Sequence, residues 1–204
     1  MNVSQPWNVV FLIGFVVFYG IRTAYVRAAK SERTVISQFD GLEKFLLAIM
    51  FPPTMLLPLL YLFTPLLSFA DYRIASAIPW FGAATMVVSL WLFWRSHADL
   101  GKNWSVSVEL REGHALVTRG VYHFIRHPMY AAIWLWAFAQ GMLLANWLAG
   151  WSVVPAFATM YFLRVGREEE LMCESFGQAY REYMLRTGRL LPRLKTEEPS
   201  ASSD

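Results

Sequence analysis

The sequence predicts an all-α, polytopic integral membrane protein with five transmembrane helices and a C-terminal helical hairpin. Hydrophobic residues make up 56% of the 204 residues and aromatic residues 16%, and the mean hydropathy is +0.35. The surface of a soluble protein does not tolerate so many apolar side chains. The apolar residues also form long runs divided by polar connections, as in a helical bundle that crosses a bilayer. We expect a single membrane domain over residues 1–195 and a disordered polar tail over residues 196–204.

The first predicted span covers residues 6–26, in which Arg22 is the one charged residue. Its length is sufficient to cross about 30 Å of hydrocarbon at about 1.5 Å per residue. A cleaved signal peptide is the alternative interpretation. Such a peptide has basic residues near its start, however, and the first twenty residues contain no Lys or Arg.

The second predicted span covers residues 41–67 and follows Asp40-Gly-Leu-Glu43, which has the form of a helix N-cap with reciprocal capping. Each proline in a helix removes a backbone donor. We therefore expect this helix to be kinked, with neighbouring helices satisfying the freed carbonyl groups. The four prolines of this span are Pro52, Pro53, Pro58 and Pro65.

The remaining predicted spans cover residues 78–95, 130–145 and 147–165. Gly101 is expected to end the third helix, and the connection from Lys102 to Tyr130 is the longest polar one in the chain. Long ordered connections often carry function. Spans four and five should form a hairpin, and we expect the last helix to continue past Glu168 through Gly177 to Tyr183 as a cytosolic extension.

The basic residues predict the orientation of this bundle. Of the 18 Lys and Arg residues, all except Arg73 fall in the first loop and its flanks, in the long connection or in the C-terminal part. Cytosolic segments are enriched in Lys and Arg. The distribution therefore predicts an N-terminus outside and a C-terminus in the cytosol, with the polar connection and its functional residues on the cytosolic side.

Other features exclude several classes of site. A single cysteine, Cys173, excludes an intramolecular disulfide framework and a cysteine-rich zinc site. The four histidines show no metal-ligand spacing, so we expect no metal. The basic residues are dispersed between apolar segments, so we expect the bilayer, and no nucleic acid, as a partner.

The segment Gly120–Tyr130 combines cationic and aromatic residues directly before an apolar run. Pro128 fits the first turn of a helix, which places Arg126 and His127 beside free N–H groups and the positive end of the helix dipole. An anionic ligand group would bind well there. The alternative is a basic loop that touches anionic headgroups. The mixture of Tyr, His and Gly argues against this alternative, because a purely electrostatic patch would be richer in Lys.

Arg164 and Glu168 lie four residues apart on one helix face, where the last span leaves the bilayer. One interpretation is an interfacial ion pair, which contributes at most about 1 kcal/mol if it is exposed. The other is a functional pair, because ionisable groups at membrane depth commonly serve function. The sequence leaves both interpretations open.

Four motifs follow one another in the second half of the chain. They are Gly113-His114-Ala-Leu-Val117-Thr-Arg-Gly120-Val-Tyr122, Arg126-His127-Pro128-Met-Tyr130, Arg164-Val-Gly-Arg-Glu168-Glu169-Glu170 and Phe176-Gly-Gln-Ala-Tyr180-Arg-Glu-Tyr183. In this order they resemble the isoprenylcysteine carboxyl methyltransferase family, most closely its short prokaryotic members with five spans. The related phospholipid methyltransferases share the Arg-His-Pro and paired-Glu features. The resemblance covers about the last hundred residues.

The resemblance implies S-adenosylmethionine as cofactor, with S-adenosylhomocysteine as product. It implies Arg164 and Glu168 as catalytic residues, with Arg164 also binding the acceptor. The cofactor carboxylate suits Arg126 and His127, its ammonium suits Glu168, and its adenine suits Tyr or apolar neighbours. The residues implied to hold the cofactor are His114, Val117, Tyr122, Arg126, His127, Pro128, Met129 and Glu168.

The acceptor implied by the resemblance is the carboxylate of a lipophilic or prenylated small molecule or peptide. A phospholipid amine or another lipophilic amine is the enzymatic alternative, and it requires a base such as Glu169 or His97. A non-catalytic membrane scaffold or transporter subunit is the alternative from another class. Such a protein would show an inverted repeat, and the sequence shows none. The sequence does not define the oligomeric state.

Overall fold

The computed structural model describes residues 5–29, 34–37, 41–101, 109–111 and 115–193. The bundle is built from α1 (Pro6–Ala29), α2 (Gly41–Phe51), α3 (Leu57–Phe63), α4 (Ile78–Leu100), α5 (Pro128–Leu143), α6 (Val153–Phe176) and α7 (Gln178–Arg186). Short helical turns are η2 (Pro52–Leu56), η3 (Ser68–Ala70), η5 (Gly120–His123) and η6 (Trp147–Trp151). The predicted helical architecture is confirmed.

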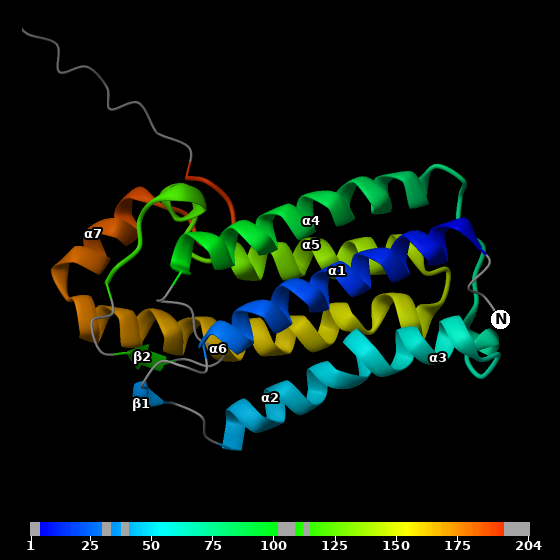
Figure 1. Ribbon diagram of the computed structural model, residues 1–204, viewed down its shortest axis with the longest axis horizontal. Helices are drawn as coiled ribbons and strands as arrows, with labels where there is room; N and C mark the ends of the chain where they lie inside the picture. Colours follow the sequence, from blue (N-terminus) through cyan, green and yellow to red (C-terminus); the bar gives the residue numbers. More distant parts are fainter. Residues whose placement is uncertain (1–4, 30–33, 38–40, 102–108, 112–114, 194–204) are drawn as a thin grey trace, which may run out of the picture.

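The long helices run side by side along the longest axis of the molecule (Figure 1). Helices α1, α4 and α5 pack together, and α6 contacts α5 on one side and α2 on the other. One apolar core joins α1, α4 and α5 around Phe11, Met86 and Trp136. A second core joins α2, α5 and α6 around Leu46 and Phe157. The second core adjoins the polar residues described below.

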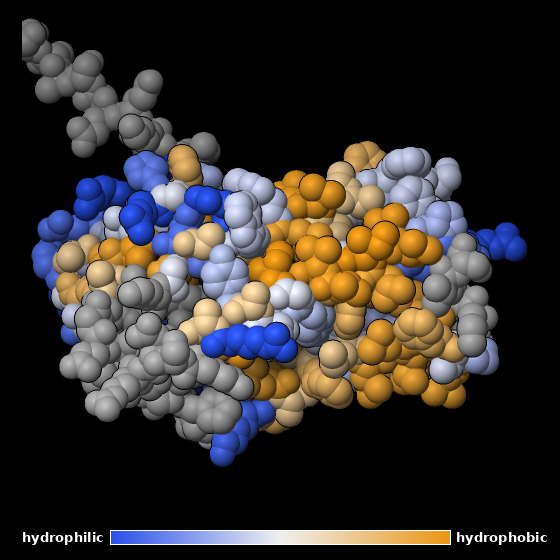
Figure 2. Space-filling model, viewed as in Figure 1, coloured by the Kyte–Doolittle hydropathy of each residue, from blue (hydrophilic) through white to orange (hydrophobic). Residues whose placement is uncertain are grey.

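Apolar residues cover much of the outer surface of the bundle. Figure 2 shows them over the long helices, with hydrophilic residues gathered at the end that carries α7. Within the described residues, three helical stretches are long and apolar enough to cross a bilayer, namely Pro6–Ala28, Gly41–Phe63 and Trp147–Phe176. An exposed apolar belt of this kind is typical of a surface that faces lipid.

A small antiparallel sheet joins β1 (Thr34–Ser37) to β2 (Glu109–Arg111). The all-α prediction did not include it. The two strands belong to connections that are separated by three helices in the chain, so no local hairpin pattern announces their pairing. The sheet ties the first connection to the long connection that precedes α5.

The proline-rich second span is interrupted at its prolines. A π-helical turn, η2, separates α2 from α3, and the backbone N–H of Leu57 donates to the carbonyl of Pro52. The next donor in this register would come from Pro58, which has no N–H. The side chain of Gln140 on α5 instead donates to the carbonyl of Pro53, at 2.8 Å. A neighbouring helix thus satisfies a carbonyl group freed by proline.

Helix ends differ from the predicted spans at several points. Helix α3 ends at Phe63 rather than at residue 67, and α4 continues to Leu100, where Gly101 has φ +54° as a helix stop requires. The prediction that the last helix continues through Gly177 is wrong. Gly177 also has φ +54°, so α6 ends at Phe176 and α7 begins a new direction.

Candidate active site

The start of α5 is held by backbone contacts with the C-terminal segment. Pro128 occupies the first turn, as predicted, and His127 precedes it. The backbone N–H of Arg126 donates to the carbonyl of Gly188 at 2.8 Å, and that of His127 donates to the carbonyl of Arg189 at 2.9 Å. We call residues 184–193 the C-terminal strap, because they lie across this helix start.

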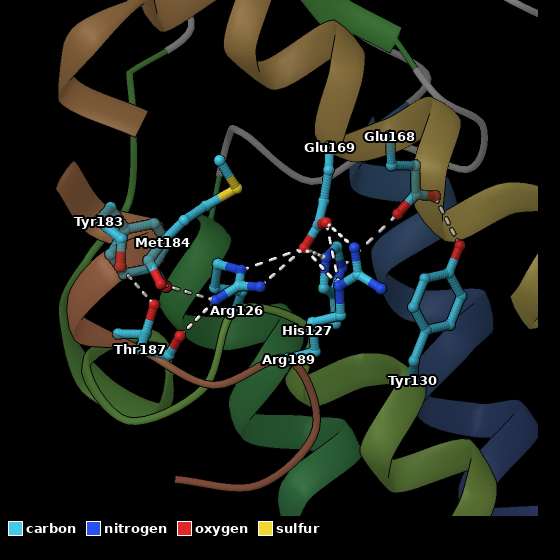
Figure 3. A network of polar contacts seen from close by, with 9 residues as sticks. All are labelled: Arg126, His127, Tyr130, Glu168, Glu169, Tyr183, Met184, Thr187 and Arg189. Carbon is cyan, nitrogen blue, oxygen red and sulfur yellow. Dashed lines mark hydrogen bonds and ion pairs between the residues drawn. The ribbon is translucent and has the colours of Figure 1, made fainter. Parts of the chain in front are cut away.

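Glu169 of α6 is the centre of the polar network in Figure 3. Its carboxylate lies 3.1 Å from Nε of Arg126 and 3.2 Å from Nε2 of His127. Arg189 of the C-terminal strap contacts both oxygens of the same carboxylate, and this contact raises the pKa of the guanidinium. The Glu169 side chain is only 9% exposed, so its charge is compensated by these side-chain partners rather than by water.

Arg126 also holds the C-terminal strap directly. Its Nη1 donates to the carbonyl groups of Met184, at 3.2 Å, and Thr187. Tyr183, just before the strap, donates its hydroxyl to the carbonyl of Tyr122, and Tyr122 donates to the carbonyl of Ser96. Burial raises the pKa of Tyr183 to about 12 and holds the pKa of Tyr122 well above its usual value, so both hydroxyls remain donors at neutral pH.

The turn that carries Tyr122 is fixed by Asp99 near the end of α4. The carboxylate of Asp99 accepts the N–H of Val121 at 2.9 Å and pairs with Arg95 at 2.5 Å. Gly120 has φ +62°, and a Cβ atom there would lie 2.1 Å from the Asp99 carboxylate. Only glycine fits this approach, which places Tyr122 against α4.

Glu168 contacts a different set of partners from Glu169. It accepts the hydroxyl of Tyr130 at 2.6 Å and lies 2.8 Å from Nε of Arg164. Nδ1 of His127 is 3.8 Å away, so His127 stands between the two carboxylates. The Glu168 side chain is 21% exposed, more than twice the value for Glu169, which leaves it the more accessible carboxylate.

Arg164 lies between two carboxylates. Its Nε pairs with Glu168, and its Nη1 lies 3.1 Å from Glu43, which comes from α2. The predicted ion pair with Glu168 is therefore present. It is not the exposed pair of the first interpretation, since Arg164 is 8% exposed and Glu43 only 2%.

The structure brings together most of the residues that the sequence singles out. Arg126, His127, Arg164 and Glu168 form one network with Tyr130, and Pro128 and Met129 lie in the first turn of α5. Tyr122 is linked to this network through Tyr183 and the C-terminal strap. Val117 precedes η5, lies outside any helix or strand and is partly buried. His114 falls outside the described residues.

Sequence reasoning did not identify Glu43 and Arg189 as site residues. Glu43 was interpreted as a helix cap, and Asp40, its expected partner, lies outside the described residues. In the sequence, Arg189 is one of the basic residues of the C-terminal part and carries no other signal. Glu169 was considered only as a base for an amine acceptor, although two adjacent carboxylates can both face inward, as Glu168 and Glu169 do here. His97, the other suggested base, contacts the carbonyl of Phe93 and packs beside Tyr25.

The residues at this site suit a zwitterionic ligand. Arg126 and His127 offer cationic or donor groups for a carboxylate, and the accessible Glu168 beside them offers an acceptor for an ammonium group. The ring of Tyr130 stacks on His127 at a centroid distance of 5.6 Å, adding an aromatic surface. The part of the chain that the structure describes contains no cluster of potential metal ligands.

Comparisons with known proteins show which family the sequence resembles. A family-wide sequence model, described as the isoprenylcysteine carboxyl methyltransferase (ICMT) family, matches residues 82–174. A protein-S-isoprenylcysteine O-methyltransferase of Dictyostelium discoideum is 30% identical over 110 residues, which are 51% of this chain and 45% of that protein. A probable protein-S-isoprenylcysteine O-methyltransferase of Oryza sativa subsp. indica is 23% identical over 93% of this chain and 96% of its own length.

A solved structure extends the similarity to the fold. The eukaryotic intramembrane Ras methyltransferase ICMT, solved without a monobody, aligns with 94% of this chain and 69% of its own, with a TM-score of 0.58 and 19% identity. The match to the Dictyostelium protein, in contrast, spans less than half of that protein's length. The comparisons therefore confirm the predicted resemblance to the family and an integral membrane fold.

Proposed function

From this similarity to the isoprenylcysteine carboxyl methyltransferase family, we propose that the protein is a membrane methyltransferase that uses S-adenosylmethionine. One observation carries the proposal. Arg126 and His127 contact Glu168 and Glu169, although about 40 residues separate the two pairs in the sequence. These four residues occur in the motifs on which the resemblance rests. A scaffold would have no need for so many buried, mutually paired charges at one helix start.

We assign the cofactor's amino-acid part to the start of α5. Arg126 and His127 bind its carboxylate, and Glu168 accepts its ammonium group. We assign the adenosine part to Val117, Tyr122, Pro128 and Met129, and the family resemblance adds His114 to this set. In the structure Arg126 is already paired with Glu169, so the cofactor carboxylate shares or replaces that contact.

We assign the acceptor carboxylate to Arg164. When bound, the cofactor supplies a methyl carbon that leaves its positively charged sulfur, which retains the bonding electron pair, and joins the acceptor oxygen without transfer of a proton. Arg164 aims that oxygen and excludes water by its burial. Because the reaction cancels opposite charges, a water-poor site favours it over the solvated reactants. An amine acceptor would require a base in addition, and Glu169 is already in contact with Arg126, His127 and Arg189.

We also propose that α4 and α5 complete five spans, with the N-terminus outside and the site in the cytosol. Helix α4 has 23 residues, enough to cross the hydrocarbon. Helix α5 has 16 residues and is about 24 Å long, which is short for a full crossing. We therefore place its polar start at the bilayer surface. This depth would allow a lipophilic acceptor to approach from the bilayer and the cofactor from the cytosol.

The test is transfer of a labelled methyl group by the purified protein to an S-farnesylated cysteine and, in parallel, to phosphatidylethanolamine. We expect labelling of the cysteine carboxylate alone. Labelling of the amine alone would replace the proposed acceptor. Absence of both labelling and S-adenosylhomocysteine binding would reject the methyltransferase.

A further inference from the structure

Glu43 is a buried carboxylate that the proposed cofactor site does not use. It is the third residue of α2 and only 2% exposed. Its neighbours Leu42, Leu46 and Met50 belong to the core that joins α2 to α6. The face of α2 that carries Glu43 is therefore clamped against α6. Carboxylates are almost never fully buried unless they are paired, and one partner of Glu43 is Arg164.

The two carboxylates on Arg164 occupy different nitrogens of its guanidinium group. Glu168 takes Nε at 2.8 Å, and Glu43 takes Nη1 at 3.1 Å. The contacts of these two ion pairs fall on Nε and Nη1, which leaves Nη2 as the third nitrogen of the guanidinium group. Nη2 belongs to both edges of the planar fork and so points between the two carboxylates.

We propose that Glu43 is a positioning residue for the acceptor, which acts by holding Arg164 so that Nη2 alone is offered to the acceptor carboxylate. This inference rests on the proposed function. Both two-pronged edges of the guanidinium are already engaged, so Arg164 binds one oxygen of the acceptor and leaves the other oxygen to attack. The contact also makes α2 part of the acceptor site, because Glu43 belongs to that helix.

Glu43 and Glu168 then have different roles toward Arg164. Glu168 is shared with the cofactor side through Tyr130 and His127, and Glu43 lies on the side of α2. When Glu168 pairs with a ligand ammonium, Glu43 remains to hold the guanidinium in place. Without Glu43, the long arginine side chain would regain rotamers that misplace Nη2, and small misplacements of a reacting group reduce rates strongly.

The experiment compares Glu43→Gln with Glu174→Gln, an exposed position on α6 that serves as the matched control. Three quantities are measured for each: S-adenosylhomocysteine affinity, binding of S-farnesylated cysteine without cofactor, and kcat and KM for that acceptor. We expect Glu43→Gln to lower kcat/KM for the acceptor by about 10-fold or more and to leave S-adenosylhomocysteine affinity within about twofold. The control should match the wild type in all three.

A double variant separates positioning from general stabilisation. If Glu43 acts through Arg164, Glu43→Gln should have little further effect on kcat/KM in an Arg164→Lys background, because the two changes then share one interaction. Additive losses, or parallel loss of cofactor binding and thermal stability, would overturn the inference, as would activity equal to that of the control. If the wild type methylates neither acceptor, the proposed function fails instead, and acceptor binding alone still distinguishes Glu43→Gln from its control.

Discussion

Arg126 makes contacts of two kinds, and its replacement tests the cofactor site at the scale of one residue. Arg126→Ala removes a charge-assisted contact of about 1.5 to 3 kcal/mol, so S-adenosylhomocysteine should bind about 10- to 150-fold more weakly. The control is Arg186→Ala, because Arg186 is exposed and its ion pair with Glu182 is long, at 4.0 Å. Isothermal titration of both variants gives the answer. Unchanged affinity in a folded Arg126→Ala protein would refute the role of Arg126 in cofactor binding.

Arg164 and Glu168 are partners in the structure, yet their conservative replacements should have different effects. Glu168→Gln should weaken cofactor binding, because an amide is a poorer acceptor for an ammonium group than a carboxylate. Arg164→Lys should leave cofactor affinity nearly unchanged and reduce turnover by about 100-fold, because lysine lacks the planar fork that Glu43 and Glu168 hold. Titration followed by methyl transfer at saturating cofactor separates them. Equal, small losses of thermal stability alone would favour a purely structural ion pair.

At the scale of the elements, Gln140 on α5 connects three segments of the bundle. Its amide donates to the carbonyl groups of Pro53 and Ala149, and its oxygen accepts the indole N–H of Trp136. Gln140→Leu leaves these buried groups unpaired, so the free energy of unfolding should fall by about 1 to 3 kcal/mol. Unfolding in mixed micelles measures this, with the exposed Gln178→Leu as control. A Gln140→Leu protein as stable as the control would mean that water or backbone rearrangement satisfies these groups.

The sequence predicted those features of the elements that depend on local patterns. Pro128 at the first turn of α5 and Gly101 after α4 are local signals, and both predictions are confirmed. Glu43 and Arg189 were missed because their partners, Arg164 and Glu169, lie in other elements. The sequence periodicity does not show which of the adjacent carboxylates Glu168, Glu169 and Glu170 face inward. Gly177 was misjudged because the helical pattern continues on both sides of it, although its positive φ ends α6.

At the scale of the whole molecule, the prediction concerns orientation in the membrane. The concentration of Lys and Arg on one side predicts that tags at residues 1 and 204 lie on opposite sides. Protease or alkylation accessibility of each tag in sealed vesicles measures this. A tag at residue 73, in the connection before α4, should behave like the tag at residue 1. Accessibility of both termini from the same side would exclude five spans and a cytosolic site.

The position of the C-terminal strap in the chain determines when its contacts can form during synthesis. The helices that form the bundle are synthesised before the strap, yet Arg126 acquires its contact with Thr187 only after a further 61 residues have been added. At about 5 to 20 residues per second, this interval lasts roughly 3 to 12 s. Glu169 is added 43 residues after Arg126, so only in the last part of this interval can it pair with Arg126 and His127 while Arg189 is still missing. Nascent chains stalled before residue 187 should therefore enter the membrane with the α5 start still open to protease.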